Sequence, residues 1–178
     1  MKNDPPRVPE QLTQIIAKQI SLLAKFEVEC VIVGGVAATL HGSAFPTNDL
    51  DVCYARTPGN LERLAAALQS VRARLRNAPE DIPFILDAET LGRGLNFTFS
   101  TDIGSLDLLG ELRGVGYYDD VLAGSLIMDL LGHRFAVIDI NKLIVAKRNA
   151  GRPKDMVTVA ELEALLDAQN SSASDNKL

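Results

Sequence analysis

The hydrophobic positions of the chain follow two spacings, and the changes between them divide it into predicted helices and strands. In residues 10–26 the apolar side chains recur three or four positions apart, which predicts an amphipathic helix. Residues 28–33 (VECVIV) are β-branched and almost wholly apolar, as is typical of a buried central strand. Gly34-Gly35 ends that strand, and a short helix is expected at residues 36–40.

Polar and apolar residues alternate again after a turn that contains Pro46. Residues 49–54 (DLDVCY) therefore predict a second, half-buried strand. A helix capped by Asn60 is expected to continue to about Arg76. Two strand pairs are expected beyond it, residues 95–100 with 105–109 and residues 125–131 with 134–138.

The C-terminal part of the chain predicts two helices. Asp139 can cap the first of them, and Gly151 can close it. The sequence from Thr158 to Glu161 (TVAE) matches a capping box, which predicts a last helix that ends near Gln169.

These elements predict one domain with a mixed α/β (α+β) fold, for which 178 residues are an ordinary length. The expected architecture is a twisted mixed sheet of about five strands with helices mainly on one face. Its core would be residues 10–138, and residues 139–169 would form a helical segment of the same domain. Residues 1–9 and 170–178 are proline-rich or polar, so they are expected to be disordered.

Composition and charge argue against several classes of protein. The net charge is −5 at pH 7, so the basic face of a stable duplex-binding protein is not expected, although an RNA substrate on a local patch stays open. No apolar signal segment and no run of about 18 apolar residues occurs, so a cytoplasmic protein without membrane contact is expected. Cys30 and Cys53 lie in predicted strands and are expected to be buried thiols.

The first candidates for chemistry are Asp49 and Asp51. They are two positions apart in a predicted strand, so both carboxylates leave the same face and repel each other unless a cation lies between them. Carboxylate oxygens of this kind, together with substrate phosphates, are typical ligands of Mg²⁺. Chance alone supplies roughly one Asp-x-Asp in a chain of this composition, so the pair becomes informative only through its position.

The position of the acid pair, shortly after a glycine turn, suggests that phosphate is bound beside it. It follows about fifteen residues after Gly34-Gly35, where the backbone can approach a ligand and the start of a helix offers free N–H groups to phosphate. A phosphate-binding turn and a metal-binding pair would then lie close together. That combination is what metal-assisted nucleotidyl transfer requires.

These segments resemble the DNA polymerase β-type nucleotidyltransferase superfamily, and most of all its small bacterial members related to abortive-infection (AbiE-type) toxins. The resemblance lies in three short motifs, Gly34-Gly35, His41-Gly42-Ser43 and Thr47-Asn48-Asp49-Leu50-Asp51-Val52. Two C-terminal stretches are also similar to the family, residues 142–148 and residues 151–155.

The resemblance implies a third carboxylate on a later strand. Asp107 is the best candidate, because it interrupts a strand of leucines where a carboxylate has no packing role. The competing aspartates are Asp102, Asp119, Asp120 and Asp129.

The same resemblance implies the roles of the site. Asp49, Asp51 and Asp107 would bind Mg²⁺ and act in catalysis. The expected nucleotide-binding residues are Gly34, Gly35, Thr47, Lys142 and Lys147. The two lysines are five positions apart on one predicted helix, so at most one is expected to reach phosphate from it.

The substrate would be a nucleoside triphosphate, and the acceptor would be tRNA, a protein side chain or a small molecule such as an aminoglycoside. A partner chain or a homodimer would complete the acceptor site, and a role in a toxin–antitoxin system is one expectation. Two rivals stay open. One is a non-catalytic regulatory member, which Gly34-Gly35 favours because relatives commonly carry Gly-Ser there. The other is a module that binds a triphosphate without transferring it.

Overall fold

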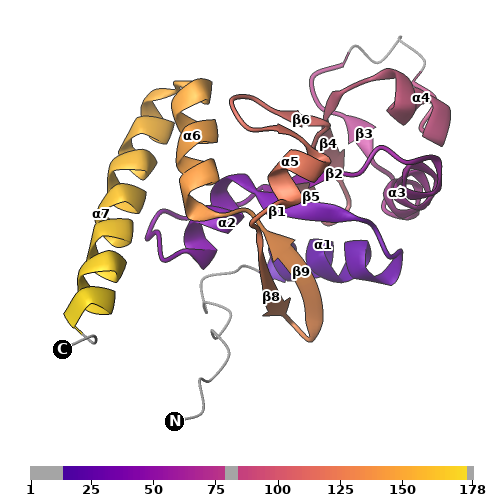
Figure 1. The fold of residues 1–178 in the computed structure, drawn as a ribbon. Coiled ribbons are helices and arrows are strands. Elements are labelled where there is room, and N and C mark those ends of the chain that lie inside the picture. Colours follow the sequence, from indigo (N-terminus) through magenta and orange to yellow (C-terminus); the bar gives the residue numbers. More distant parts are fainter. Residues whose placement is uncertain (1–13, 79–83, 176–178) are drawn as a thin grey trace.

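A computed structural model describes residues 14–78 and 84–175 of the chain (Figure 1). Its helices are α1 Gln14–Lys25, α2 Gly34–Leu40, α3 Pro58–Ser70, α4 Ala88–Arg93, α5 Tyr118–Leu122, α6 Ile140–Ala150 and α7 Pro153–Asp175. Its strands are β1 Cys30–Val33, β2 Leu50–Tyr54, β3 Arg74–Leu75, β4 Asn96–Thr101, β5 Gly104–Leu109, β6 Glu111–Leu112, β7 Gly116–Tyr117, β8 Leu126–Leu130 and β9 His133–Val137. None of the helices in the described part is long and apolar enough to cross a membrane.

The strands form one large mixed sheet and a small ribbon. The sheet has seven strands in the order β3-β4-β5-β2-β1-β9-β8, where about five were expected, and β6 pairs with β7 alone. Strand β2 runs antiparallel to β1 and parallel to β5, while β1 runs parallel to β9. The mixed α/β fold expected from the sequence is confirmed.

The central strands separate an apolar face of the sheet from a face that carries acids. Leu50 and Val52 of β2 are fully buried and stand opposite Leu106 and Leu108 of β5. Because side chains alternate along a strand, the residues between them leave the other face. The parallel register pairs Asp51 with Asp107, so two carboxylates project side by side from neighbouring strands.

Helices α1 and α3 contact each other and bury their apolar side chains in the same core as the leucines of the sheet. The buried residues of these helices include Ile16, Ile20, Leu23, Leu64 and Leu68. Helices α6 and α7 lie side by side at the opposite end of the molecule from β3 and α4 (Figure 1). This arrangement brings the start of α7 to the acidic side of the sheet, where its residues line the cavity described below.

The predicted helix from Asn60 to Arg76 is wrong at both ends. Helix α3 begins at Pro58, and Asn60 is fully buried inside it, with its side chain bonded to the backbone of Glu29 and Ala55. The helix ends at Ser70, and the chain then forms strand β3. A buried asparagine that ties a helix to a neighbouring loop depends on tertiary contacts that local spacing does not encode.

The predicted capping box at Thr158 is also wrong. Helix α7 begins at Pro153, whose fixed φ suits a first helical turn, and Thr158 is buried inside the helix with its hydroxyl bonded to the carbonyl of Lys154. The helix continues to Asp175, so residues 170–175 are helical rather than disordered. The rest of the two ends predicted to be disordered, and residues 10–13 of the first predicted helix, lie outside the described residues.

The predicted boundaries of α6 are confirmed. Asp139 caps the helix by accepting hydrogen bonds from the backbone amides of Asn141 and Lys142. Gly151 ends it in the left-handed conformation, with φ of 65°. Helix α6 is therefore held at both ends, which fixes the direction in which its side chains leave it.

Cys30 and Cys53 are buried free thiols, as expected.

Candidate active site

The Gly34-Gly35 turn lies directly against the side chains of the acidic segment. Gly34 has φ of +63°, and a Cβ at this position would lie 2.0 Å from Oδ2 of Asp51. A Cβ at Gly35 would lie 2.5 Å from Oγ1 of Thr47. A larger residue at either position would overlap a side chain that faces the cavity unless that side chain moved, and the positive φ of Gly34 also favours glycine.

The carboxylates of Asp51 and Asp107 are electrostatically coupled. Burial, and then the charge of Asp107, raise the pKa of Asp51 to about 6, although the backbone amide of Gly35 donates a hydrogen bond to it. Burial also raises the pKa of Asp107, against the opposing charge of Arg76, and the charge of Asp49 adds to the increase. Clustered, partly desolvated carboxylates of this kind are stabilised by a cation.

The acids and the glycine turn line a cavity of about 400 Å³. The predicted residues in its wall are Gly34, Gly35, Thr47, Asp49, Asp51, Asp107 and Lys147. A second cavity of about 370 Å³ adjoins it and is also lined by Gly34, Asp51, Asp107, Lys147, Arg152 and Asp155. Seven of the eight predicted site residues thus face one cavity, and the acids Asp51 and Asp107 border both.

Lys142 is the predicted site residue that the structure places elsewhere. Its ammonium group donates hydrogen bonds to the backbone carbonyls of Asp120 and Ala123 at the end of α5. It lines neither cavity beside the acids. The packing of α6 thus turns Lys147, and not Lys142, toward the acids, and the contact of either lysine with phosphate stays a prediction.

Lys147 belongs to an ionic cluster beside the acids, in which Asp155 is buried and Arg152 is exposed. The side chain of Asp155 is 2% exposed; its Oδ1 lies 3.4 Å from Nζ of Lys147, and its Oδ2 lies 2.5 Å from Nε of Arg152. Although burial opposes it, the hydrogen bond from Arg152 and the charge of Lys147 lower the pKa of Asp155. Asp155 therefore stays ionised and holds both cations at the wall that the two cavities share.

The loop from α2 to β2 is tied to α7 beside the first cavity. The carboxylate of Glu161 accepts hydrogen bonds from the hydroxyl of Ser43 at 2.5 Å and from the backbone amide of Ala44 at 2.8 Å. The next residue, Phe45, has a side chain that is 46% exposed and lines the cavity. Val157 of α7, which is 55% exposed, lines the same cavity.

Arg76 is the main residue of the site that the sequence did not reveal. Its guanidinium group forms an ion pair with Asp107 and lies 3.7 Å from Oδ2 of Asp49. The sequence pattern placed Arg76 at the end of a helix, whereas it directly follows the two-residue strand β3. A strand so short carries no periodicity, and it forms only because β4 pairs with it.

The donor chemistry of the acids fits Mg²⁺, since carboxylates on adjacent strands offer the hard oxygen ligands that this ion prefers. Across residues 14–78 and 84–175, however, no group of three His, Cys, Asp or Glu side chains is close enough to hold an ion. The guanidinium of Arg76 lies on two of the three acids instead. The acids are thus compensated by a cation of the protein itself.

The fold was compared with known proteins. No family model matches the chain, and no curated protein matches it in sequence. Eight chains of solved structures are similar to it in fold, among them the three that follow. The first is the lincosamide antibiotic adenylyltransferase LnuA in its lincomycin-bound form, with a TM-score of 0.56 and 11% sequence identity, over 85% of this chain and 96% of that one.

The second similar structure is TM1012 from Thermotoga maritima, a protein proposed to be a nucleotidyltransferase, with a TM-score of 0.52 and 15% identity, over 92% of this chain and 96% of that one. The third is the antibiotic-resistance factor ANT(2'')-Ia, with a TM-score of 0.52 and 14% identity, over 92% of this chain and 94% of that one. The chain therefore has a nucleotidyltransferase fold, as its motifs predicted. The finer resemblance to abortive-infection proteins stays a prediction.

The raised pKa of Asp51 leads to a prediction about stability. Its carboxyl holds a proton up to about pH 6 in the folded protein and only to about pH 4 in the unfolded chain, so metal-free stability should fall as the pH rises between these values. Asp51→Asn should remove this fall and stabilise the protein at pH 8 by about 1–2 kcal/mol, less than the full shift implies because the side chain keeps some contact with solvent.

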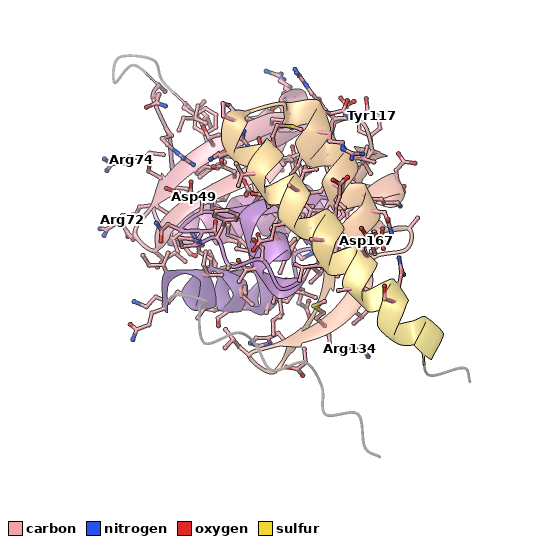
Figure 2. All side chains as sticks on the ribbon, turned by 90° about the vertical axis from the view of Figure 1, so that its left-hand side faces the viewer. Asp49, Arg72, Arg74, Tyr117, Arg134 and Asp167 are labelled. Atoms are coloured by element: carbon pink, nitrogen blue, oxygen red, sulfur yellow. The ribbon has the colours of Figure 1, made fainter. Side chains whose placement is uncertain are left out.

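Thermal unfolding in EDTA from pH 4 to pH 8 measures this effect. Asp167→Asn, at an exposed position of α7 (Figure 2), is the control for loss of one negative charge. If Asp51→Asn unfolds at a lower temperature than the unmodified protein at pH 8, Asp51 is a structural residue and its place in the site is wrong.

Proposed function

We propose that the protein is a magnesium-dependent nucleotidyltransferase that moves a nucleoside monophosphate from a nucleoside triphosphate to an acceptor hydroxyl. The observation that carries this proposal is the convergence of the Gly34-Gly35 turn, Asp51 and Asp107 on one cavity. Its volume of about 400 Å³ lies within the range of small-molecule sites. The nucleotidyltransferase fold supports the same class of reaction.

The triphosphate would lie between the glycine turn and the cationic wall of the cavity. The backbone at Gly34 and Gly35 can approach phosphate closely, and Lys147 and Arg152 supply positive charge opposite it. The nucleobase would lie at the other end of the cavity, against Phe45 and Val157, whose exposed apolar side chains would otherwise face water.

Asp49, Asp51 and Asp107 would hold magnesium, which when bound would neutralise phosphate charge and polarise the α-phosphate. The protein's own contribution follows from the position of its side chains. Asp107 borders the second cavity, so its carboxylate would accept the proton of an acceptor hydroxyl there. The hydroxyl oxygen bonds to the α-phosphorus, the bond to the β-phosphate oxygen breaks, and Lys147 and Arg152 neutralise the departing pyrophosphate.

A small molecule is the acceptor that we favour among the three classes expected from the sequence. The second cavity of about 370 Å³ is the size of a small-molecule site and shares Asp107 with the first. Two of the similar structures are named for antibiotics, a lincosamide adenylyltransferase and an antibiotic-resistance factor. The toxin–antitoxin role, the cytoplasmic location and the partner chain or homodimer stay predictions.

The reaction can be tested with triphosphates labelled at either end. Incubation with Mg²⁺, host extract and an α-labelled triphosphate should place label on the small-molecule fraction, whereas a γ-labelled triphosphate should leave acceptors unlabelled and release labelled pyrophosphate. Label on RNA or protein would change the acceptor class. Label on an acceptor after incubation with the γ-labelled triphosphate would show phosphoryl transfer and contradict the proposal.

A non-catalytic, nucleotide-binding role is the second candidate. The observation in its favour is Arg76, which occupies the acids that magnesium would need. If the protein binds the Mg²⁺–triphosphate but labels no fraction of the extract, this second function is the correct one.

The proposed place of the nucleobase predicts a selective loss of binding. Phe45→Ala should weaken binding of a nucleoside triphosphate by about tenfold, because stacking of a base on an aromatic ring contributes about 1–3 kcal/mol. Inorganic tripolyphosphate has no base, so its affinity should not change. Calorimetry with both ligands measures the difference, and Phe84→Ala, at an aromatic residue that packs on Phe97 and Phe99 and lines neither cavity, is the control. An equal loss for both ligands would contradict the placement.

A further inference from the structure

Arg76 reaches the acids from the edge of the sheet. Its backbone amide donates to the carbonyl of Thr98 at 2.8 Å, which fixes the start of the side chain beside β4. From there the guanidinium extends to Asp107 and to within 3.7 Å of Asp49, and the side chain is 29% exposed. One residue thus bridges two of the three carboxylates proposed to bind metal.

The guanidinium and a metal ion would compete for the same oxygen atoms. A carboxylate oxygen that accepts a charge-assisted hydrogen bond from arginine has its lone pair directed at that donor rather than at an ion. Asp51, the third acid, forms no ion pair with Arg76. No three-ligand metal site is preformed among the described residues, which agrees with this arrangement.

The position of Arg76 is incompletely satisfied, which makes its release feasible. Its Nε is buried without a hydrogen-bond partner, and a buried donor without a partner costs free energy. The side chain borders solvent, so the guanidinium can turn toward water or toward the phosphates of an arriving ligand. A triphosphate would bring both the metal and a new anionic partner for the arginine.

We propose that Arg76 is a resident cation that a divalent metal must displace from Asp107 and Asp49, so that metal binds weakly until a polyphosphate arrives. Arg76 thereby makes metal binding depend on the nucleotide. This inference rests on the proposed function, because it concerns the same acids. It adds a residue that sets the order of binding, and this order can be measured without any turnover.

The test is a titration with Mn²⁺, followed by electron paramagnetic resonance, on the full chain without nucleotide. Arg76→Gln should bind Mn²⁺ about tenfold more tightly than the unmodified protein, since it removes one charge-assisted contact from the acids. Arg76→Lys keeps the charge but not the forked geometry, so its affinity should lie between the two. Adding tripolyphosphate should reduce the difference in Mn²⁺ affinity between Arg76→Gln and the unmodified protein, because the polyphosphate draws Arg76 away from the acids in the unmodified protein.

Arg74→Gln is the matched control. Arg74 lies on β3, two residues before Arg76; it points outward from the sheet edge (Figure 2) and forms no ion pair with any residue that the structure describes. Arg74→Gln removes the same charge as Arg76→Gln. The Mn²⁺ affinity of this variant should stay within about twofold of that of the unmodified protein, as expected for a screened surface charge. A gain as large as that of Arg76→Gln would show a general charge effect and overturn the proposal.

Two further outcomes would overturn the proposal in different ways. Equal Mn²⁺ affinity of Arg76→Gln and the unmodified protein would exclude competition by Arg76 and leave the proposed transferase intact. No binding of Mn²⁺ to either would remove the metal site from the proposed function as well. If Arg76→Gln does not fold, as judged by circular dichroism, the comparison rests on Arg76→Lys, and an affinity equal to that of the unmodified protein then contradicts the proposal.

Discussion

Asp107→Ala is expected to abolish transfer while leaving triphosphate binding largely intact. Asp107 borders the second cavity, where the acceptor would lie, so its loss removes the group that takes the proton of the attacking hydroxyl. Turnover should fall by about 10³-fold, within the range for loss of a general base together with a metal ligand. Asp49 and Asp51 remain to hold the metal that arrives with the triphosphate, so ground-state binding should change much less than kcat.

Asp51→Ala, unlike Asp107→Ala, should lose both triphosphate binding and transfer. Asp51 lies between the glycine turn and Asp107 and would hold the metal that arrives with the triphosphate. Binding by calorimetry and labelling by gel, measured on the same preparations, separate the two phenotypes. Asp102→Ala is the control, because Asp102 pairs with Arg72 at the turn between β4 and β5, outside both cavities. If Asp107→Ala retains full transfer, Asp107 is not part of the reaction.

The second large effect is expected at Gly34. In Gly34→Ala the new methyl group would have to occupy a point 2.0 Å from the carboxylate of Asp51, and φ of +63° is unfavourable for alanine by about 1–2 kcal/mol. The overlap can be relieved only by moving Asp51 or by opening the turn. Transfer should therefore fall at least about 100-fold, because misplacement of a reacting group by about 1 Å is enough for such a loss.

Gly132→Ala is the control that separates the steric overlap at Gly34 from the free-energy cost of alanine at a positive φ. Gly132 also has a positive φ of 79°, but nothing lies within 4 Å of its Cβ position. This variant should lose only about 1–2 kcal/mol of stability, a decrease in Tm of about 2–8 °C, and keep full transfer. Equal activity of Gly34→Ala and Gly132→Ala would contradict the close contact between the turn and the acid.

The sequence predicted the parts of the site that local pattern determines. Strand alternation placed Asp49 and Asp51 on one face, and the Gly34-Gly35 pair predicted a turn against which another group could pack. The family resemblance implies a third carboxylate, and Asp107 fits this role because a carboxylate among leucines needs a partner. In the structure, the parallel pairing of β2 and β5 aligns Asp107 with Asp51.

The parts that the sequence did not predict depend on contacts between distant segments. Arg76 enters the site through β3, which exists only by pairing with β4, more than twenty residues further along the chain. The choice between Lys142 and Lys147 depends on how α6 packs against its neighbours, and both residues are compatible with the same helical pattern. Thr158 fitted a capping box, yet Pro153 starts the helix one and a half turns earlier.

The central claim is that the glycine turn and the acids form a site for a Mg²⁺–triphosphate, and calorimetry with a non-reactive α,β-methylene triphosphate tests it most directly. The account predicts one bound analogue per chain in the presence of Mg²⁺, with binding weakened at least about 100-fold by EDTA or by Asp51→Ala, since both remove the metal that joins protein to phosphate. An unmodified protein that binds no Mg²⁺–triphosphate analogue would contradict the transferase and the nucleotide-binding alternative together.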